Sequence, residues 1–136
     1  LPVEKRKDRD FFIGDMIPTC VYEDQNIAKE VNRKTLIPYA SLENYRNYWK
    51  EAGYEEEMAA VENVINKGGD AAEIGLCFSN KWLSDNTLFG SSSMVLEGLE
   101  AWYDCGITTP VLVPSSAQGN QLTAIAEIFE LCERLN

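Results

Sequence analysis

The chain has 136 residues, of which 45% are hydrophobic, so it is long enough for one domain with a packed core. Twelve basic residues against 22 acidic ones give a formal net charge of -10, which repels the phosphates of nucleic acids and of anionic lipids. Its apolar runs are far shorter than the roughly 20 residues that cross a bilayer. We therefore expect a soluble, cytoplasmic protein with neither a nucleic-acid nor a membrane partner.

Cysteine and histidine usage argues against metal binding. The four cysteines stand far apart and the chain has no histidine, so no zinc set is expected. Cys105 and Cys132 stand at apolar helical positions, which predicts buried, reduced thiols and no disulfide. The lack of histidine also excludes a Ser/His/Asp triad, and neither a GxGxxG nor a GxxxxGK loop is present.

The first third of the chain predicts a strand followed by helices. The apolar and β-branched stretch 11–22 predicts the strand, and Asp24 is a suitable N-cap for a helix that we expect Pro38 to interrupt. The expected apolar face of this helix comprises Ile27, Val31 and Leu36. Ser41 predicts the cap of the next helix, and Gly53 predicts its end. Its expected stripe comprises Leu42, Tyr45, Trp49 and Ala52.

A third helix follows, and then a stretch without a clear period. Met58, Val61 and Ile65 predict the apolar side of this helix, while glutamates 55–57 at its start suit the helix dipole and solvent better than paired acid catalysis. The stretch 70–90 predicts a short helix and a loop. Its expected anchors are Trp82, Leu83 and Phe89.

The last third predicts helix, strand and helix. Serines 91 to 93 begin a helix that ends at Gly106, with an apolar side of Val95, Leu99 and Trp102. The stretch 108–116 is almost continuously apolar, which is typical of a strand covered on both faces in a parallel sheet. The expected stripe of the last helix comprises Leu122, Ile125, Phe129, Cys132 and Leu135.

Strands that alternate with helices predict an α/β fold. Two parallel strands alone leave sheet edges and apolar faces uncovered. We therefore interpret residues 1–136 as a single segment of a larger sheet, completed by further chain or by a second copy in a homo-oligomer. The start at Leu1 indicates a processed chain or a fragment.

Three features in combination resemble a known family. The first is a strand followed by "ED" and a helix, the second is "YRNYWKEAGY" leading into an acidic helix, and the third is "LFGSSSMVLEGLEAWYDCGITTPVLVP". Over roughly residues 11 to 133 the chain resembles the carboxyl-terminal part of luciferase-like monooxygenases, which are flavin- or deazaflavin-dependent oxidoreductases built on a (β/α)8 TIM barrel. The resemblance implies that 11–22 and 109–114 are the last two barrel strands and that 41–67 is a helical insertion, which leaves the barrel incomplete.

The resemblance also implies an activity. It points to an oxidoreductase or monooxygenase that uses FMN or a deazaflavin on a small organic substrate. Most of the cofactor site and the catalytic residues would lie in the absent barrel half, so we expect the isolated chain to be inactive. The alternative is a non-catalytic half-barrel that serves as a binding or assembly module.

Active sites of TIM barrels lie at the carboxyl ends of the strands. The candidates for cofactor binding or a substrate mouth are therefore Thr19, Tyr22, Ser115, Ser116, Gln118, Gly119 and Asn120. The loop 115–120 has a simpler interpretation as a polar turn that caps the last helix. An aromatic group is also denser than a solvent face requires, and comprises Tyr39, Tyr45, Tyr48, Trp49 and Tyr54. Core packing explains Tyr45 and Trp49, and the others suit a substrate mouth or a subunit contact.

Overall fold

The computed structural model describes residues 12–135, so Phe11 of the predicted first strand lies outside it. Its centre is a three-stranded parallel sheet in the order β2-β1-β3. The strands are β1 (Gly14–Val21), β2 (Leu88–Gly90) and β3 (Thr109–Ser115). The predicted α/β class is therefore confirmed.

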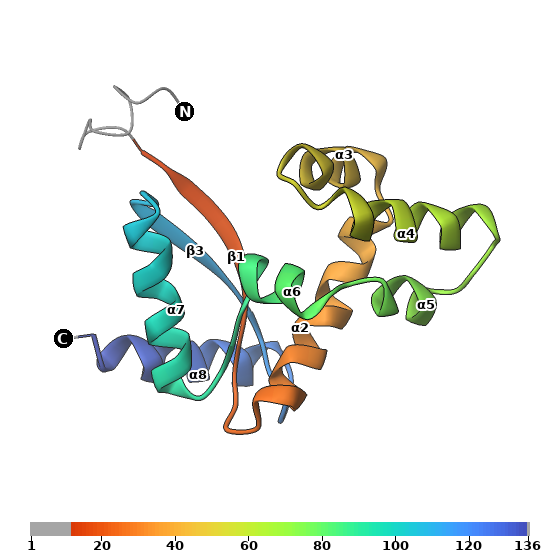
Figure 1. Ribbon diagram of the computed structural model, residues 1–136. Coiled ribbons are helices and arrows are strands. Elements are labelled where there is room, and N and C mark those ends of the chain that lie inside the picture. The colour runs from red at the N-terminus through yellow and green to blue at the C-terminus, as the bar shows by residue number, and fades with distance from the viewer. Residues whose placement is uncertain (1–11, 136) are drawn as a thin grey trace.

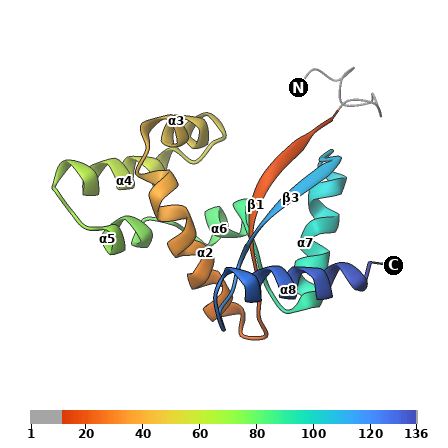
Figure 2. The same ribbon diagram turned by 180° about the vertical axis from the view of Figure 1, so that it is seen from behind.

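Helices cover the sheet from two sides. Those between β1 and β2 are α2 (Gln25–Ala40), α3 (Glu43–Glu51), α4 (Glu55–Asn66), α5 (Ala71–Leu76) and α6 (Asn80–Asn86). After β2 come α7 (Ser92–Asp104) and, beyond β3, α8 (Gln121–Glu133). The group α2–α6 and helix α7 lie on opposite sides of the strands, while α8 crosses near the carboxyl ends of β1 and β3 (Figures 1 and 2). In the order β2-β1-β3, the crossover from β1 to β2 runs across the sheet in the opposite direction to the crossover from β2 to β3. Two right-handed crossovers in opposite directions place their helices on opposite faces of the sheet.

Each side has its own hydrophobic core. Trp82 is fully buried at the centre of the helical side, with its ring 4.4 Å from that of Phe78 and 4.9 Å from that of Trp49. The second core lies between the sheet and helices α7 and α8, and Ile17 of β1 is fully buried in it. Strand β2 contacts both cores, because Leu88 belongs to the second core and Phe89 packs against the first.

Strand β2 corrects the expectation of a loop in 70–90, and two helices precede it rather than one. The Tyr22 N–H donates to the Gly90 carbonyl over 2.8 Å, and the buried Asn32 side chain donates to the Leu88 carbonyl over 2.9 Å. Pairing with β1 begins only at Thr19, directly after Pro18, which has no N–H to donate. A strand of three residues is too short to show a period in the sequence.

Strand β3 is not covered on both faces as we expected. It is an edge strand, none of its seven residues is buried, and Val111 is 43% exposed. The Thr109 N–H donates to the Ile13 carbonyl over 3.1 Å, so the backbone of Thr109 faces β1. The N–H and C=O groups of the alternate positions, Pro110, Leu112 and Pro114, therefore face the outer edge of the sheet. Two of those three positions are prolines and cannot donate to a further strand.

The strand order bears on the barrel interpretation. A barrel adds each strand beside the preceding one, which would give the order β1-β2-β3. The described strands have β1 in the middle and form an open sheet. What the structure shows is therefore a small parallel α/β sheet, and not a closed barrel.

Helix α2 continues through Pro38 to Ala40, although we expected Pro38 to interrupt it. Pro38 stands two residues before the helix ends, so little of the hydrogen-bond ladder remains to be broken. The buried positions recur every four residues, at Ala28, Asn32, Leu36 and Ala40. Ile27 lies outside this row and is 46% exposed.

The start of α3 also differs from the prediction. Its N-cap is Leu42 rather than Ser41, and the Ser41 hydroxyl donates to the Ile37 carbonyl at the end of α2. Trp49 is buried as part of the predicted stripe, but Leu42 is exposed. The buried position that the pattern missed is Arg46.

The predicted stripe of α8 is mostly uncovered. The buried residues of this helix are Ala124 and Leu131, whereas Leu122 is 75% and Phe129 68% exposed. The cysteine expectation also fails at Cys105, which is exposed, whereas Cys20 is buried. All four thiols are free, as predicted.

Candidate functional site

The predicted strand-end residues come together at one edge of the sheet. The parallel register places Cys20 opposite Ser115, and the Ser115 hydroxyl lies 3.2 Å from that of Thr35 on α2. The Ser116 hydroxyl accepts from the N–H groups of Gln118 and Gly119 over 3.1 and 3.2 Å and donates to Glu127 over 3.0 Å. The loop after β3 is thus tied together by its own serine.

The rest of this loop caps α8. The Asn120 side chain accepts from the Leu122 and Thr123 N–H groups over 3.0 and 3.2 Å. A Cβ at Gly119 would lie only 2.5 Å from the Thr123 hydroxyl, which explains the glycine. The Ser116 hydroxyl, the Asn120 side-chain oxygen and the four backbone N–H groups that they bind are therefore already engaged within the chain.

The two candidates on β1 do not open towards that loop. Thr19 is fully buried, and its hydroxyl donates to the Ile17 carbonyl over 2.9 Å. Tyr22 follows β1 and is half-buried, with its backbone N–H bound to β2. The structure consequently assigns both residues a part in holding the sheet together.

Beneath the loop lie Cys20, near the carboxyl end of β1, and Glu127 of α8, which we did not single out from the sequence. Burial raises the pKa of the Cys20 thiol to about 11, with a further contribution from the negative charge of Glu127, while the Ala117 N–H opposes the shift. The second Glu127 oxygen, Oε2, is buried and has no hydrogen-bond partner among residues 12–135. At neutral pH the Cys20 thiol is thus protonated and a poor nucleophile.

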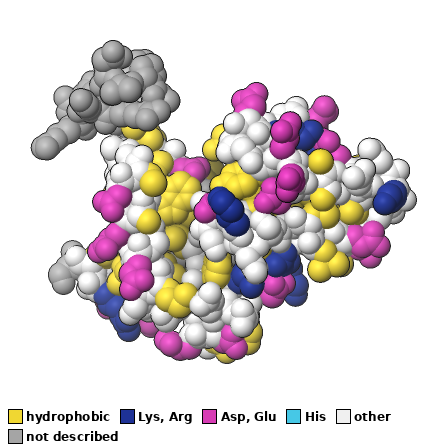
Figure 3. Space-filling view, viewed as in Figure 1, with side chains coloured by type: hydrophobic (Ala, Val, Ile, Leu, Met, Phe, Trp, Pro, Cys, Tyr) yellow, Lys and Arg dark blue, Asp and Glu magenta, His cyan; other side chains and the backbone are white. Residues whose placement is uncertain are grey.

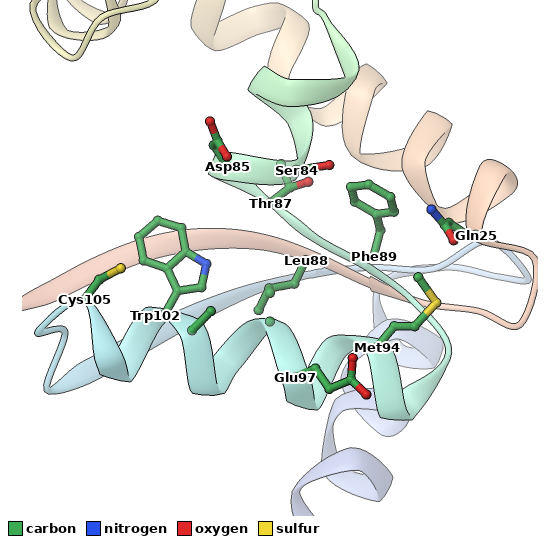
Figure 4. A pocket seen from close by; sticks show the side chains of 12 residues that line it. Gln25, Ser84, Asp85, Thr87, Leu88, Phe89, Met94, Glu97, Trp102 and Cys105 are labelled. Atoms are coloured by element: carbon green, nitrogen blue, oxygen red, sulfur yellow. The ribbon is translucent and has the colours of Figure 1, made fainter.

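A groove of about 640 Å³ runs along the outer edge of β2 (Figure 4). Apolar side chains of Leu88, Phe89, Met94 and Trp102 line it, with Asp85 on the α6 side and Glu97 on α7. In the space-filling view, hydrophobic side chains gather in the hollow between the α7 side and the α6 side of the molecule (Figure 3). Because the Gly90 carbonyl faces β1, the backbone of Phe89 faces outward into this groove.

Tyr54, one of the aromatic candidates, lies beside Asp85, which lines that groove. Its hydroxyl donates to Asp85 over 2.7 Å, and Lys81 lies 5.4 Å from its ring centre. Burial and the Asp85 carboxylate together raise the pKa of Tyr54 to about 12. Tyr54 is therefore held by a surface network and does not join the other tyrosines.

The remaining four aromatic candidates line a second cavity, which we call the aromatic cleft. It measures about 460 Å³ and lies between the sheet and helices α2 and α3. Its lining comprises Asp15, Met16, Pro18, Thr35, Leu36, Tyr39, Asn44, Tyr45, Tyr48, Trp49, Asn86 and Val113. The rings of Tyr39 and Tyr45 lie 5.3 Å apart edge to face, and those of Tyr48 and Trp49 lie 6.3 Å apart in the same manner. The cleft is thus walled by mutually packed aromatic side chains on one side and by strand residues on the other.

One end of the aromatic cleft is polar. Strand β2 pairs with β1 only from Thr19 onward, so the earlier part of β1 has an uncovered edge, where the Met16 N–H donates to its neighbour Asp15 over 2.8 Å. Partial burial raises the pKa of the Asp15 carboxyl, and the Met16 N–H opposes the shift. The amides of Asn44 and Asn86 also line the cleft. A carboxylate, two amides and an aromatic wall suit a small organic ligand.

Three comparisons, with models of protein families, with curated proteins and with solved structures, find no match for this chain. Within residues 12–135, no group of His, Cys, Asp and Glu side chains has the arrangement of a metal site. No helix in the described part of the chain is long and apolar enough to span a membrane.

The sequence suggested a substrate mouth or a subunit contact for Tyr39, Tyr48 and Tyr54. The structure places Tyr39 and Tyr48 in the lining of the aromatic cleft, and Tyr54 outside it. The sequence reserved Tyr45 and Trp49 for the core; Trp49 is buried, but Tyr45 is 37% exposed. It missed Asp15, and the one available signal was a lone carboxylate within an apolar strand.

Proposed function

We propose that the chain is the carboxyl-terminal part of a luciferase-like, flavin- or deazaflavin-dependent oxidoreductase acting on a small organic substrate. In this proposal the aromatic cleft is the share of the substrate site that these residues contribute. The observation that carries it is the placement of Tyr39, Tyr48 and Trp49 against one face of a parallel sheet around a cavity of ligand size. The family resemblance supplies the reaction class.

In this proposal the described residues do not form the flavin site themselves. Two observations support this: the side chains of Ser116 and Asn120 already accept from four backbone N–H groups at the start of α8, and the loop 115–120 contains no lysine or arginine. Cofactor binding therefore falls to residues outside this chain, as does the redox chemistry that a flavin supplies. The part left to these residues is to bind and orient the substrate and to exclude water from it.

The test begins with the coding region that precedes residue 1. We expect it to encode the first part of a barrel, and we expect the longer protein to purify with, or to bind, FMN or a deazaflavin. Residues 1–136 alone should bind neither. Quenching of the fluorescence of Trp49, Trp82 or Trp102 by micromolar FMN in the isolated chain would contradict the proposal that residues outside this chain bind the cofactor.

Two observations favour a second candidate, the non-catalytic binding or assembly module. The order β2-β1-β3 is not that of consecutive barrel strands, and α8 presents an uncovered apolar stripe. If the preceding coding region holds no barrel half and the purified chain forms a defined oligomer without flavin, this candidate replaces the first.

A further inference from the structure

We propose that the aromatic cleft binds an organic cation, namely the protonated amine or quaternary ammonium group of a small molecule. The inference rests on the proposed function only in treating this molecule as the substrate. Binding itself follows from the chemistry of the cleft and can be measured separately.

The first support is the aromatic wall. Cations are attracted to the faces of tyrosine and tryptophan rings, which carry partial negative charge. Tyr39, Tyr45, Tyr48 and Trp49 line one cavity, and Tyr48 and Tyr45 are 59% and 37% exposed. Their edge-to-face contacts hold these rings in place, so little side-chain freedom remains to be lost when a ligand binds.

The second support is the charge of the lining. Among the described residues that form the cleft, Asp15 is the only charged side chain, and none is a lysine or arginine. Its carboxyl accepts from the Met16 N–H and forms no ion pair within residues 12–135. An anion would meet this carboxylate without compensation, whereas a cation would supply its missing partner.

The third support is size. A volume of about 460 Å³ lies within the range of roughly 300–1,000 Å³ that is usual for small-molecule sites. The cleft therefore admits an ammonium group together with a short organic tail. A neutral ring of similar size would also fit, but its affinity would not change when the charge of Asp15 is removed.

The experiment compares two ligands of the same shape. Choline carries a quaternary nitrogen, and 3,3-dimethylbutan-1-ol places a neutral carbon at the same position. Each is titrated into the whole protein, in the oligomeric state in which it purifies, and binding is followed by NMR. We expect choline to bind about tenfold more tightly than the alcohol, which is the range of a partly desolvated cation–π site. Equal affinity for the two ligands, or binding of neither, would overturn the proposal.

Variants locate the site. Tyr48→Ala and Asp15→Asn should each weaken choline binding by about two- to fivefold and leave the alcohol unaffected, whereas Tyr48→Phe should retain binding because the ring face remains. The matched controls are Tyr103→Ala and Asp104→Asn, which alter an exposed tyrosine and an exposed aspartate of α7 outside the cleft. Circular dichroism identifies any variant that fails to fold. Choline binding that Tyr48→Ala and Asp15→Asn leave unchanged would also overturn the proposal.

The outcome does not depend on the flavin test. Choline binding in a protein without flavin would keep this inference and remove the proposed reaction. A flavin-loaded protein that ignores choline would keep the reaction and remove the inference.

Discussion

Asp15 is a carboxyl group that the fold keeps partly out of water and that has no cationic partner among residues 12–135. Burial raises its pKa above that of the unfolded chain. A group with a raised folded-state pKa stabilises the folded state below its unfolded pKa, and that contribution is lost as pH rises through the folded pKa. At neutral pH the charged Asp15 therefore destabilises the protein relative to a neutral side chain.

Asp15→Asn should accordingly raise the Tm at pH 7. The asparagine oxygen can still accept from the Met16 N–H, so only the charge is removed. The gain over the wild type should shrink as pH falls through the raised pKa of Asp15, where the wild-type carboxyl takes up its proton. Thermal unfolding followed by circular dichroism at several pH values measures both effects. A lower Tm of the variant at pH 7 would show that the charge has a partner that stabilises it.

The thiols should differ in reactivity for a related reason. Cys105 is exposed at the end of α7, whereas Cys20 is buried with its pKa raised to about 11. A thiol reagent at pH 8 should therefore modify Cys105 first and reach Cys20 only after unfolding. Cys105→Ala should remove the fastest phase of the reaction. Rapid labelling of Cys20 in the folded protein, identified by peptide mass, would contradict its burial.

At the scale of the element, α3 is held by the buried Trp49 and by one buried cation, Arg46. The helix has nine residues, too few to be stable alone in water. Arg46 donates to the Ala40 carbonyl at the end of α2 over 3.0 Å and lies 3.5 Å from Glu62 of α4. Arg46 thus connects helices α2, α3 and α4. Two of them carry the tyrosines of the aromatic cleft: Tyr39 lies in α2, and Tyr45 and Tyr48 lie in α3.

Arg46→Ala should lower the free energy of unfolding by about 1–3 kcal/mol, because it leaves the buried Ala40 carbonyl and part of the Glu62 charge without partners. The control is Lys50→Ala, which removes a partly exposed ion pair to the same Glu62 and should cost less than about 1 kcal/mol. Urea unfolding of both variants gives the comparison. Equal losses would mean that the ion pair, rather than the buried hydrogen bond, holds α3.

The elements also show what the sequence could predict. Local chemistry predicted the cap Asp24, the start of a helix within serines 91 to 93 and the helix end at Gly106, where φ is +105°, and the structure confirms all three. Burial was predicted less well, because an apolar stripe is buried only where a partner covers it. Leu122 and Phe129 fit the helical period and yet remain exposed.

The cleft was only half predictable for the same reason. The density of tyrosines was visible in the sequence, but their meeting with Met16 and Pro18 depends on how α3 folds back over the sheet. The position of Asp15 depends on the shortness of β2, which is fixed by a pairing almost 70 residues away in sequence and has no local signal. Tertiary pairing decided both.

At the scale of the whole molecule, the exposed apolar surface predicts association. The side chains of Leu122, Phe129 and Met16 are each more than 60% exposed, in a chain whose net charge is -10. Exposed apolar side chains of this size favour association with another surface. We expect the isolated chain not to be a stable monomer. Calorimetry with light scattering tests this expectation, and a sharp cooperative melt of a monomer would contradict it.

The two edges of the sheet should respond differently to mutation. Pro110 and Pro114 remove two N–H donors from the outer edge of β3, and the Gln121 side chain covers the Pro114 carbonyl over 3.1 Å. Pro110→Val with Pro114→Val should restore a continuous donor row and increase aggregation. Light scattering over time measures the change, and Val111→Thr serves as a control within the same strand. No increase in the double variant would mean that Gln121 and the neighbouring loop protect the edge without the prolines.

This asymmetry limits what kind of assembly the sheet can build. In the language of polymer chemistry, the described chain resembles a monofunctional unit towards copies of itself: one edge, beside Phe89, can add a strand, and the other offers only the Leu112 N–H between two prolines. Two such units can join at their β2 edges, and the product then ends in β3 on both sides. Addition of further copies at those ends is disfavoured, so we expect a pair rather than a filament, even though the chain leaves so much apolar surface in contact with water.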